Sequence, residues 1–287
     1  MSRVLPVLAV LLAIVALWYA AAVWLNSQWT YDQAARAGQH LTVIDVINDT
    51  MVQERPVLPA PHQVAAGLWD GYAGQKITSK RSLVYHSWVT LSATMLGFLI
   101  GSGLGILLAV GIVHNRAMDL SVMPWAIASQ TIPILAIAPM IIVVLSSVGM
   151  TGLVPKAIIS AYLSFFPVVV GMVKGLRSPE TAQLDLLTTY NASRWQTFWK
   201  LRLPASMPYL FASLKVSVAA SLVGAIVGEL PAGATAGLGA RLLSGSYYGQ
   251  TVQIWAALFG AAILAAVLVA AIGVVQRLTL RRMGMAA

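Results

Sequence analysis

One long polar segment interrupts the apolar second half of this chain: Asp185-Leu-Leu-Thr-Thr-Tyr-Asn-Ala-Ser-Arg-Trp-Gln-Thr-Phe-Trp-Lys-Leu-Arg-Leu-Pro204. Trp195, Phe198 and Trp199 follow the i, i+3, i+4 spacing of an amphipathic helix, so we predict two short helices joined near Asn191. Exposed aromatic side chains on a short helix usually dock onto another surface. The alternative is a helix that lies on the lipid surface. The charges of the segment are mostly basic: Arg194, Lys200 and Arg202.

The composition of the whole chain indicates a membrane protein. Apolar residues make up 59% of its 287 residues and charged residues only 9%, against about 25% charged in a soluble domain. The net charge of +9 could suggest a nucleic-acid partner, but the basic residues lie between apolar spans and form no stripe. Cysteine is absent and the four histidines lack metal-ligand spacing. We therefore expect no disulfide, no metal site and no nucleic-acid partner.

Six apolar stretches are long enough to cross a bilayer, which predicts an all-α membrane protein with six transmembrane helices. The expected spans are Val4–Leu25, His86–Val113, Leu120–Val148, Lys156–Val173, Met207–Val227 and Gln253–Val275. Ala20-Ala-Ala22 could pass for a signal-peptide cleavage site, but the first stretch exceeds the ~7–15 apolar residues of a signal peptide core. We expect an uncleaved first helix.

The second span carries a packing signal. Gly97, Gly101 and Gly105 recur every four residues, which places a flat strip on one face of the helix. A neighbouring helix is expected to approach closely there.

The third span is broken by Gln130-Thr-Ile-Pro133 and again by Pro139. A proline inside a span frees backbone carbonyls, which is tolerated only beside protein or a water-lined cavity. Candidates for a translocation path are therefore Ser129, Gln130, Thr131 and Pro133. Hydrogen bonding between helices is the alternative role for their polar groups.

Two regions outside the spans have a distinct composition. Ser27–Tyr85 is polar and rich in proline and glycine, so we expect an irregular loop with one helix around Thr42–Met51. Gly228–Gly239 is glycine-rich, and we expect it to be a flexible segment at the outer face. It contains Glu229, which either bonds the glycine-rich turn or takes part in gating or the substrate path.

Charge asymmetry predicts the orientation, with both termini on the cytoplasmic side. That side would hold Arg3, Arg116, Lys174, Arg177, Arg194, Lys200, Arg202, Lys215, Arg277, Arg281 and Arg282. The short outer loops hold only Lys156 and Arg241.

No catalytic constellation is visible, so we expect no enzyme activity from this chain. Proton-coupled transporters usually carry Asp, Glu or His within their spans, and here these residues are almost absent from them. The energy source is therefore expected to lie on another chain. A stand-alone secondary transporter or channel is the alternative, although no inverted repeat is visible. A membrane scaffold that transports nothing is a third reading.

The polar segment resembles the cytoplasmic "EAA" loop of binding-protein-dependent ABC importer permeases, whose pattern is E-A-A-x3-G-x9-I-x-L-P. Asp185 takes the glutamate position, Asn191 the glycine position, and Leu203-Pro204 the closing pair. Asn still permits a left-handed residue at the bend. The resemblance extends from about His86 to Arg277 and is strongest over Ala192–Pro208. It implies a MetI-like transmembrane fold.

Further stretches resemble the sulfonate, taurine and nitrate branch of these permeases. They are Ile132-Pro-Ile-Leu-Ala-Ile-Ala-Pro139, Phe165-Phe166-Pro167 and Gly228-Glu-Leu…Gly237-Leu-Gly239. The resemblance implies a dimer of permeases, two cytoplasmic ATPase subunits and a periplasmic or lipid-anchored binding protein in a bacterial inner membrane. ATP and Mg would be bound by the ATPase subunits, and no cofactor by this chain. The solute would be of the sulfonate, taurine or nitrate type, or a heteroaromatic vitamin precursor or pyrimidine.

In such permeases the loop couples the ATPase to the spans. The positions that would do so here are Asp185, Asn191, Ala192, Arg194, Trp195, Phe198, Trp199, Leu203 and Pro204. The aromatic residues would supply apolar anchors and the basic residues a charged rim. The expected division of the chain is 1–85 (first helix and periplasmic loop), 86–277 (transmembrane domain, with the coupling loop at 178–208) and a basic tail at 278–287.

Overall fold

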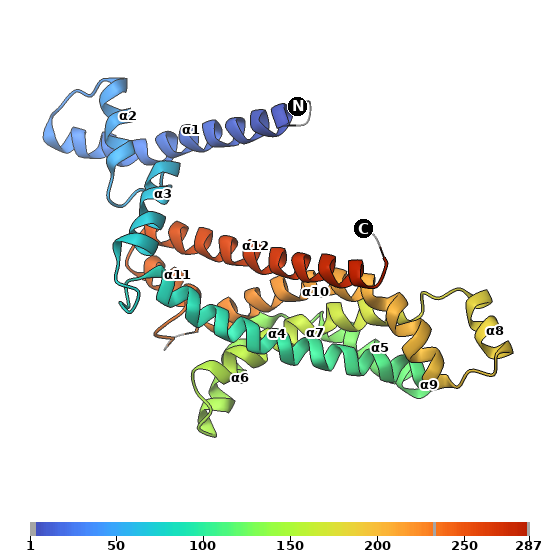
Figure 1. The fold of residues 1–287 in the computed structure, drawn as a ribbon. Coiled ribbons are helices and arrows are strands. Elements are labelled where there is room, and N and C mark those ends of the chain that lie inside the picture. The colour runs from blue at the N-terminus through green and yellow to red at the C-terminus, as the bar shows by residue number, and fades with distance from the viewer. Residues whose placement is uncertain (1–3, 232–233, 286–287) are drawn as a thin grey trace. The chain divides into compact units, whose positions relative to one another are not determined.

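The structure is a computed structural model that describes residues 4–231 and 234–285 (Figure 1). Arg3, one of the charges used for the orientation, and residues 232–233 of the glycine-rich segment lie outside this description. In chain order the helices are α1 (Val4–Ala37), α2 (Val43–Val52), α3 (Pro61–Trp69), α4 (Leu83–His114), α5 (Arg116–Ser129), α6 (Ile134–Ser147), α7 (Leu153–Leu176), α8 (Thr181–Thr189), α9 (Arg194–Thr197), α10 (Leu203–Gly228), α11 (Leu238–Tyr247) and α12 (Thr251–Arg282), with π-helical turns η1 (Asp70–Gly74) and η2 (Phe198–Arg202). The all-α prediction is confirmed: no strand occurs in the described residues.

The chain divides into two compact units. The first comprises Met1–His86 with Ala240–Ala261, and the second Ser87–Gly239 with Ala262–Ala287. The grouping of 240–261 with the N-terminal residues was not anticipated from the sequence.

In the first unit α1 packs against α2, and buried Asn26 fastens α1 to the chain that follows α2. Its amide donates to the Leu58 carbonyl (2.8 Å) and accepts from the Val57 N–H (2.8 Å). The helix expected around Thr42–Met51 is α2, which begins with a capping box between Thr42 and Asp45. Hydrogen bonds from the Thr42 hydroxyl and N–H hold the pKa of the Asp45 carboxyl below its usual value.

The expected irregular loop over Ser27–Tyr85 is wrong in two respects. The first helix continues past Leu25 to Ala37, because no breaker occurs before Gly38, which adopts a positive φ of 66°. A second helix, α3, begins at Pro61, since proline is well suited to the first position of a helix. The helix α11 (Leu238–Tyr247), which begins at the end of the glycine-rich segment, was not anticipated from the sequence.

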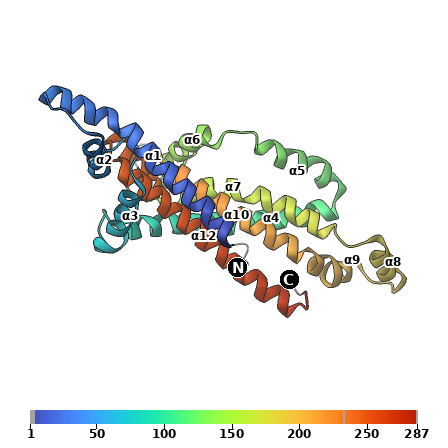
Figure 2. The same ribbon diagram turned by 90° about the horizontal axis from the view of Figure 1, so that it is seen from above.

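In the second unit α4, α7 and α10 form a closely packed core (Figure 1, Figure 2). The glycine strip of α4 meets α7 as predicted: a Cβ on Gly97, Gly101 or Gly105 would lie 2.7 to 2.8 Å from a backbone oxygen of α7. Buried hydroxyls bond across the helices. The Ser217 hydroxyl donates to the Ser164 carbonyl (2.7 Å), and the Ser221 hydroxyl to the Thr94 carbonyl (2.8 Å).

Within the described ranges 4–231 and 234–285, five helices are long and apolar enough to cross a membrane, and the bent pair α5 and α6 makes up to a sixth. The break predicted in the third span at Gln130–Pro133 is confirmed, since α5 and α6 meet there at 99°. The second expected break, at Pro139, is wrong, because Pro139 lies inside α6. The expected fifth span begins earlier than Met207, because the helical run extends from Arg194 to Gly228.

We expect Gly101→Ala to destabilise the protein by about 1–3 kcal/mol, because its methyl group would overlap the Ala161 carbonyl and Ser164. Gly103 lies in the same helix with nothing within 4 Å of an added Cβ, so Gly103→Ala is the matched control. It should be neutral or stabilising by up to about 1 kcal/mol, the helix preference of alanine. Thermal unfolding in detergent measures both, and equal midpoints would contradict the close packing.

Candidate functional site

The first candidate region is the bend between α5 and α6, where the four residues predicted for a translocation path lie together. The Ser129 and Thr131 hydroxyls donate to carbonyls of the preceding turn, and the Gln130 amide donates to the Ser129 hydroxyl (3.2 Å). Gln130, Thr131 and Pro133 are exposed. The Tyr162 hydroxyl of α7 donates to the Ser129 carbonyl and so fixes the bend to the core. The bend presents uncharged amide and hydroxyl groups.

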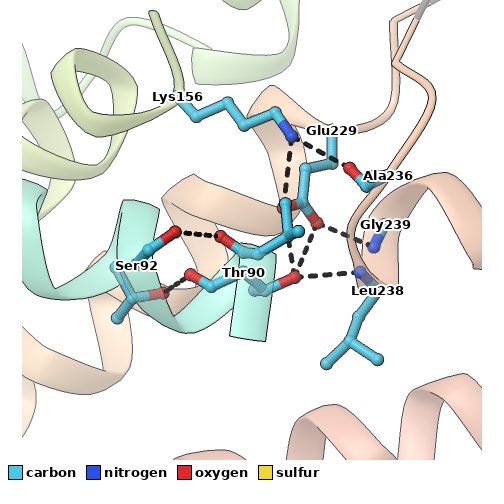
Figure 3. A network of polar contacts seen from close by, with 9 residues as sticks. Thr90, Ser92, Lys156, Glu229, Ala236, Leu238 and Gly239 are labelled. Atoms are coloured by element: carbon cyan, nitrogen blue, oxygen red, sulfur yellow. Dashed lines mark hydrogen bonds and ion pairs between the residues drawn. The ribbon is translucent and has the colours of Figure 1, made fainter. Parts of the chain in front are cut away.

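The second region is a polar network around Glu229, which is 0% exposed at the C-terminal end of α10 (Figure 3). Its carboxylate accepts from the Thr90 hydroxyl of α4 (2.9 Å) and from the Gly239 N–H (3.0 Å), and it pairs with the Lys156 ammonium of α7 (3.5 Å). A buried carboxylate needs such partners because an unpaired charge is costly to bury. The carboxylate therefore joins three helices to the glycine-rich turn.

The same network holds the turn through its backbone. The Leu238 N–H donates to the Thr90 hydroxyl (2.9 Å), and Lys156 donates to the Ala236 carbonyl (2.9 Å) (Figure 3). Gly237 has a φ of 121°, and any side chain there would collide with the Glu229 carboxylate. Sequence reasoning found Glu229 but missed Thr90, and it placed Lys156 among the outer-loop charges. The signal for this pair in the sequence was a lysine at the start of one span and a single acid at the end of another.

The third region is the segment 178–208, which lies at the end of the second unit where α7 ends and α10 begins (Figure 1). Two helices joined at Asn191 are present as predicted, and Asn191 has a positive φ of 51°. Ser193 starts α9 with a capping box to Gln196. The second helix is not separate, because α9 continues through η2 into α10. Its end is therefore fixed by the core.

The three aromatic residues of this segment do not share one environment. Trp195 is 69% exposed and Trp199 50%, whereas Phe198 is 7% exposed. Phe198 packs with Ile112 of α4 and Met172 of α7. The expectation of Phe198 as an exposed anchor is thus corrected: it lies on the edge of the aromatic stripe that faces the core. Sequence reasoning missed Leu186 and Tyr190, which are exposed apolar residues on and just after α8.

The remaining residues of the segment surround the tryptophans. Asp185, Asn191, Arg194 and Lys200 are exposed, while Ala192, Arg202, Leu203 and Pro204 are partly buried. Arg202 is not a free rim charge, since its guanidinium donates to the Leu176 carbonyl at the end of α7 (3.1 Å). No residue of α8 is buried. The segment thus presents four exposed apolar side chains: Trp195 and Trp199 on the anchored helical end, and Leu186 and Tyr190 on and just after α8.

Comparison with known proteins gives consistent results. The family described as binding-protein-dependent transport system inner membrane component matches residues 101–285. The riboflavin transport system permease protein RibX of Chloroflexus aurantiacus is 30% identical over 225 residues, 78% of this chain and 80% of that protein. The formylaminopyrimidine transport permease protein ThiX of Halalkalibacterium halodurans is 30% identical over 179 residues, 62% of this chain and 67% of that protein.

A solved structure of the MetNI methionine ABC transporter, described as inward facing, has the same fold. It aligns with a TM-score of 0.53 over 75% of this chain and 95% of that chain, at 19% identity.

We expect Gly237→Ala to destabilise the protein by at least about 3 kcal/mol, the cost of breaking a buried ion pair, because the methyl group would displace the Glu229 carboxylate. Gly249→Ala is the control, since Gly249 also has a positive φ (63°) but nothing within 4 Å. It should cost only the left-handed strain of about 1–2 kcal/mol. Thermal unfolding checks the difference, and equal losses would show that the network is not essential to stability.

Proposed function

Because this chain belongs to the family of binding-protein-dependent transport system inner membrane components, the permeases of ABC transporters, we propose that it forms the membrane path of an ATP-driven importer. A small solute would reach it from an external binding protein. The chain is a multi-pass membrane protein with several apolar helices. We place it in the inner membrane with both termini and the segment 178–208 on the cytoplasmic side, as the charge asymmetry indicates.

The observation that carries this proposal is the exposed apolar surface on the segment 178–208. Two exposed tryptophans, Trp195 and Trp199, lie 5.4 Å apart (ring centroids) on an anchored helical end, and Tyr190 is exposed at the end of α8. Tryptophan and tyrosine are the residues that most often dominate binding energy at protein interfaces. An ATPase subunit with a complementary cleft would take them as anchors, with Arg194 and Lys200 at the rim.

The proposed coupling follows from helical continuity. A displacement of Trp195 by the ATPase subunit would be transmitted through η2 into α10, because no loop separates these helices. The same displacement would reach α4 and α7 through the packing of Phe198 and through the Arg202–Leu176 hydrogen bond. ATP hydrolysis would take place on the partner subunit, and the role of this chain is to change the shape of the path.

For the solute we propose a small heteroaromatic compound. The relatives at 30% identity carry the names of riboflavin and formylaminopyrimidine transport. The α5–α6 bend also offers Ser129, Gln130 and Thr131, which suit an uncharged hydrogen-bonding ring better than a small anion. A sulfonate or nitrate is the second candidate.

In proteoliposomes with the partner subunits, uptake should depend on ATP and be competed by excess pyrimidine or flavin, but not by taurine or nitrate. The solute that co-purifies with the binding protein, in labelled form, serves as the transport substrate in this assay. Competition by the anions alone would assign the sulfonate class instead, and uptake without nucleotide would support a secondary transporter.

Trp195→Ala should uncouple ATP hydrolysis from solute uptake. Removing an interface anchor typically costs about 2 kcal/mol or more, which is roughly thirtyfold in affinity for the ATPase subunit. Trp69→Ala is the matched control, because Trp69 is similarly exposed but lies in the first unit. Phe198→Ala should instead lower stability by about 3–5 kcal/mol, as expected for a buried aromatic residue. Unchanged uptake in Trp195→Ala, measured beside ATPase activity, would refute the coupling role.

A further inference from the structure

Lys215 is a charged residue within the helical run Arg194–Gly228, one of the candidate membrane spans. The described ion pairs are Lys156–Glu229 and Arg177–Asp119, and Lys215 has neither an ion pair nor a hydrogen bond among the described residues. A basic side chain in a span normally pairs with an acid or reaches the membrane surface. Lys215 has no acidic partner among the described residues, so its ammonium group is expected to reach the membrane surface or an anion there.

The Lys215 side chain crosses to α12, within the second unit. A Cβ added to Gly273 would lie 3.6 Å from its Cε and 3.7 Å from its ammonium nitrogen. The ammonium group therefore lies against α12 at Gly273. Gly273 is nine residues before Arg282, the end of α12, or about 13 Å along the axis. A lysine at this depth can direct its ammonium group toward the headgroups.

A groove of about 490 Å³ opens at this point. Its polar lining is Lys215, Gln276 and Arg277, and it contains no acidic residue. Its apolar lining includes Val269, Val274 and Leu280, and Val274 is 46% exposed. Two cations and an amide in an otherwise apolar groove define the complement of an anionic headgroup attached to a hydrocarbon chain.

We propose that this groove binds an anionic phospholipid, with the phosphate between Lys215 and Arg277 and an acyl chain along Val269 and Val274. Basic pockets between transmembrane helices bind anionic headgroups in this way. A free anion would use the two cations but not the apolar wall, which is why the lipid is the better fit. Such a lipid would bridge α10, the helix that continues from the segment 178–208, and α12. The inference rests on the membrane placement of the chain and not on the identity of the solute.

The test is native mass spectrometry of the full chain released from nanodiscs of phosphatidylcholine with a minor fraction of phosphatidylglycerol. The wild-type chain should retain phosphatidylglycerol selectively. Lys215→Gln and Arg277→Gln should each reduce that retention about fivefold, the usual contribution of one basic residue at an anionic surface. Lys215→Arg should preserve it.

Lys76→Gln is the matched control, because it removes the same charge from an exposed position in the first unit and should not change retention. Equal retention in wild type, Lys215→Gln and Arg277→Gln would overturn the proposal. Displacement of the lipid by inorganic phosphate at matched concentration would also overturn it, since that result would assign a free-anion site. Thermal unfolding in pure phosphatidylcholine shows that each variant is folded.

Discussion

The close approach of α4, α7 and α10 is the constraint on which the second unit depends. Lipid tails are as apolar as leucine, so helices in a bilayer associate through van der Waals packing and hydrogen bonds rather than through the hydrophobic effect. Here Gly97, Gly101 and Gly105 bring two backbones into contact. Buried serine hydroxyls then bond backbone carbonyls of the neighbouring helix, as Ser217 and Ser221 do. The distance between the helices is therefore set by these glycines and serines, whose positions leave no space for a larger side chain.

This core positions both ends of the unit. At one end it holds Glu229 against Thr90 and Lys156, and through them the turn before α11. At the other end it receives Phe198 and the Arg202 guanidinium, which fix the base of the segment 178–208. The intervening α10 is continuous with α9 through η2. In our account, a displacement imposed on the exposed tryptophans would be carried along α10 rather than absorbed in a loop.

The features that depend on local sequence were the ones that could be predicted. The glycine strip of α4, the bend at Asn191 and the helix at Val43–Val52 each follow from residues close together in the chain. The helix α11 was missed because the glycines before it favour a loop, and its start depends on tertiary bonds to Glu229 and Thr90.

Features that depend on distant residues could not be predicted. The Thr90–Glu229 contact joins residues 139 positions apart, and no periodic pattern encodes it. The spacing of Trp195, Phe198 and Trp199 predicted a shared stripe correctly, but it could not say which edge of the stripe faces the core. The 99° bend between α5 and α6 likewise exceeds what Pro133 alone specifies.

The central claim is that the segment 178–208 contacts an ATPase subunit, and the absence of native cysteine allows a direct measurement. Tyr190→Cys would be labelled with a benzophenone maleimide in native membranes and irradiated, and the adducts identified by mass spectrometry. Tyr247→Cys, at a similarly exposed tyrosine on α11, is the control. The account predicts an adduct with an ABC ATPase subunit from position 190 and none from position 247. No ATPase adduct from position 190, or equal adducts from both positions, would contradict it.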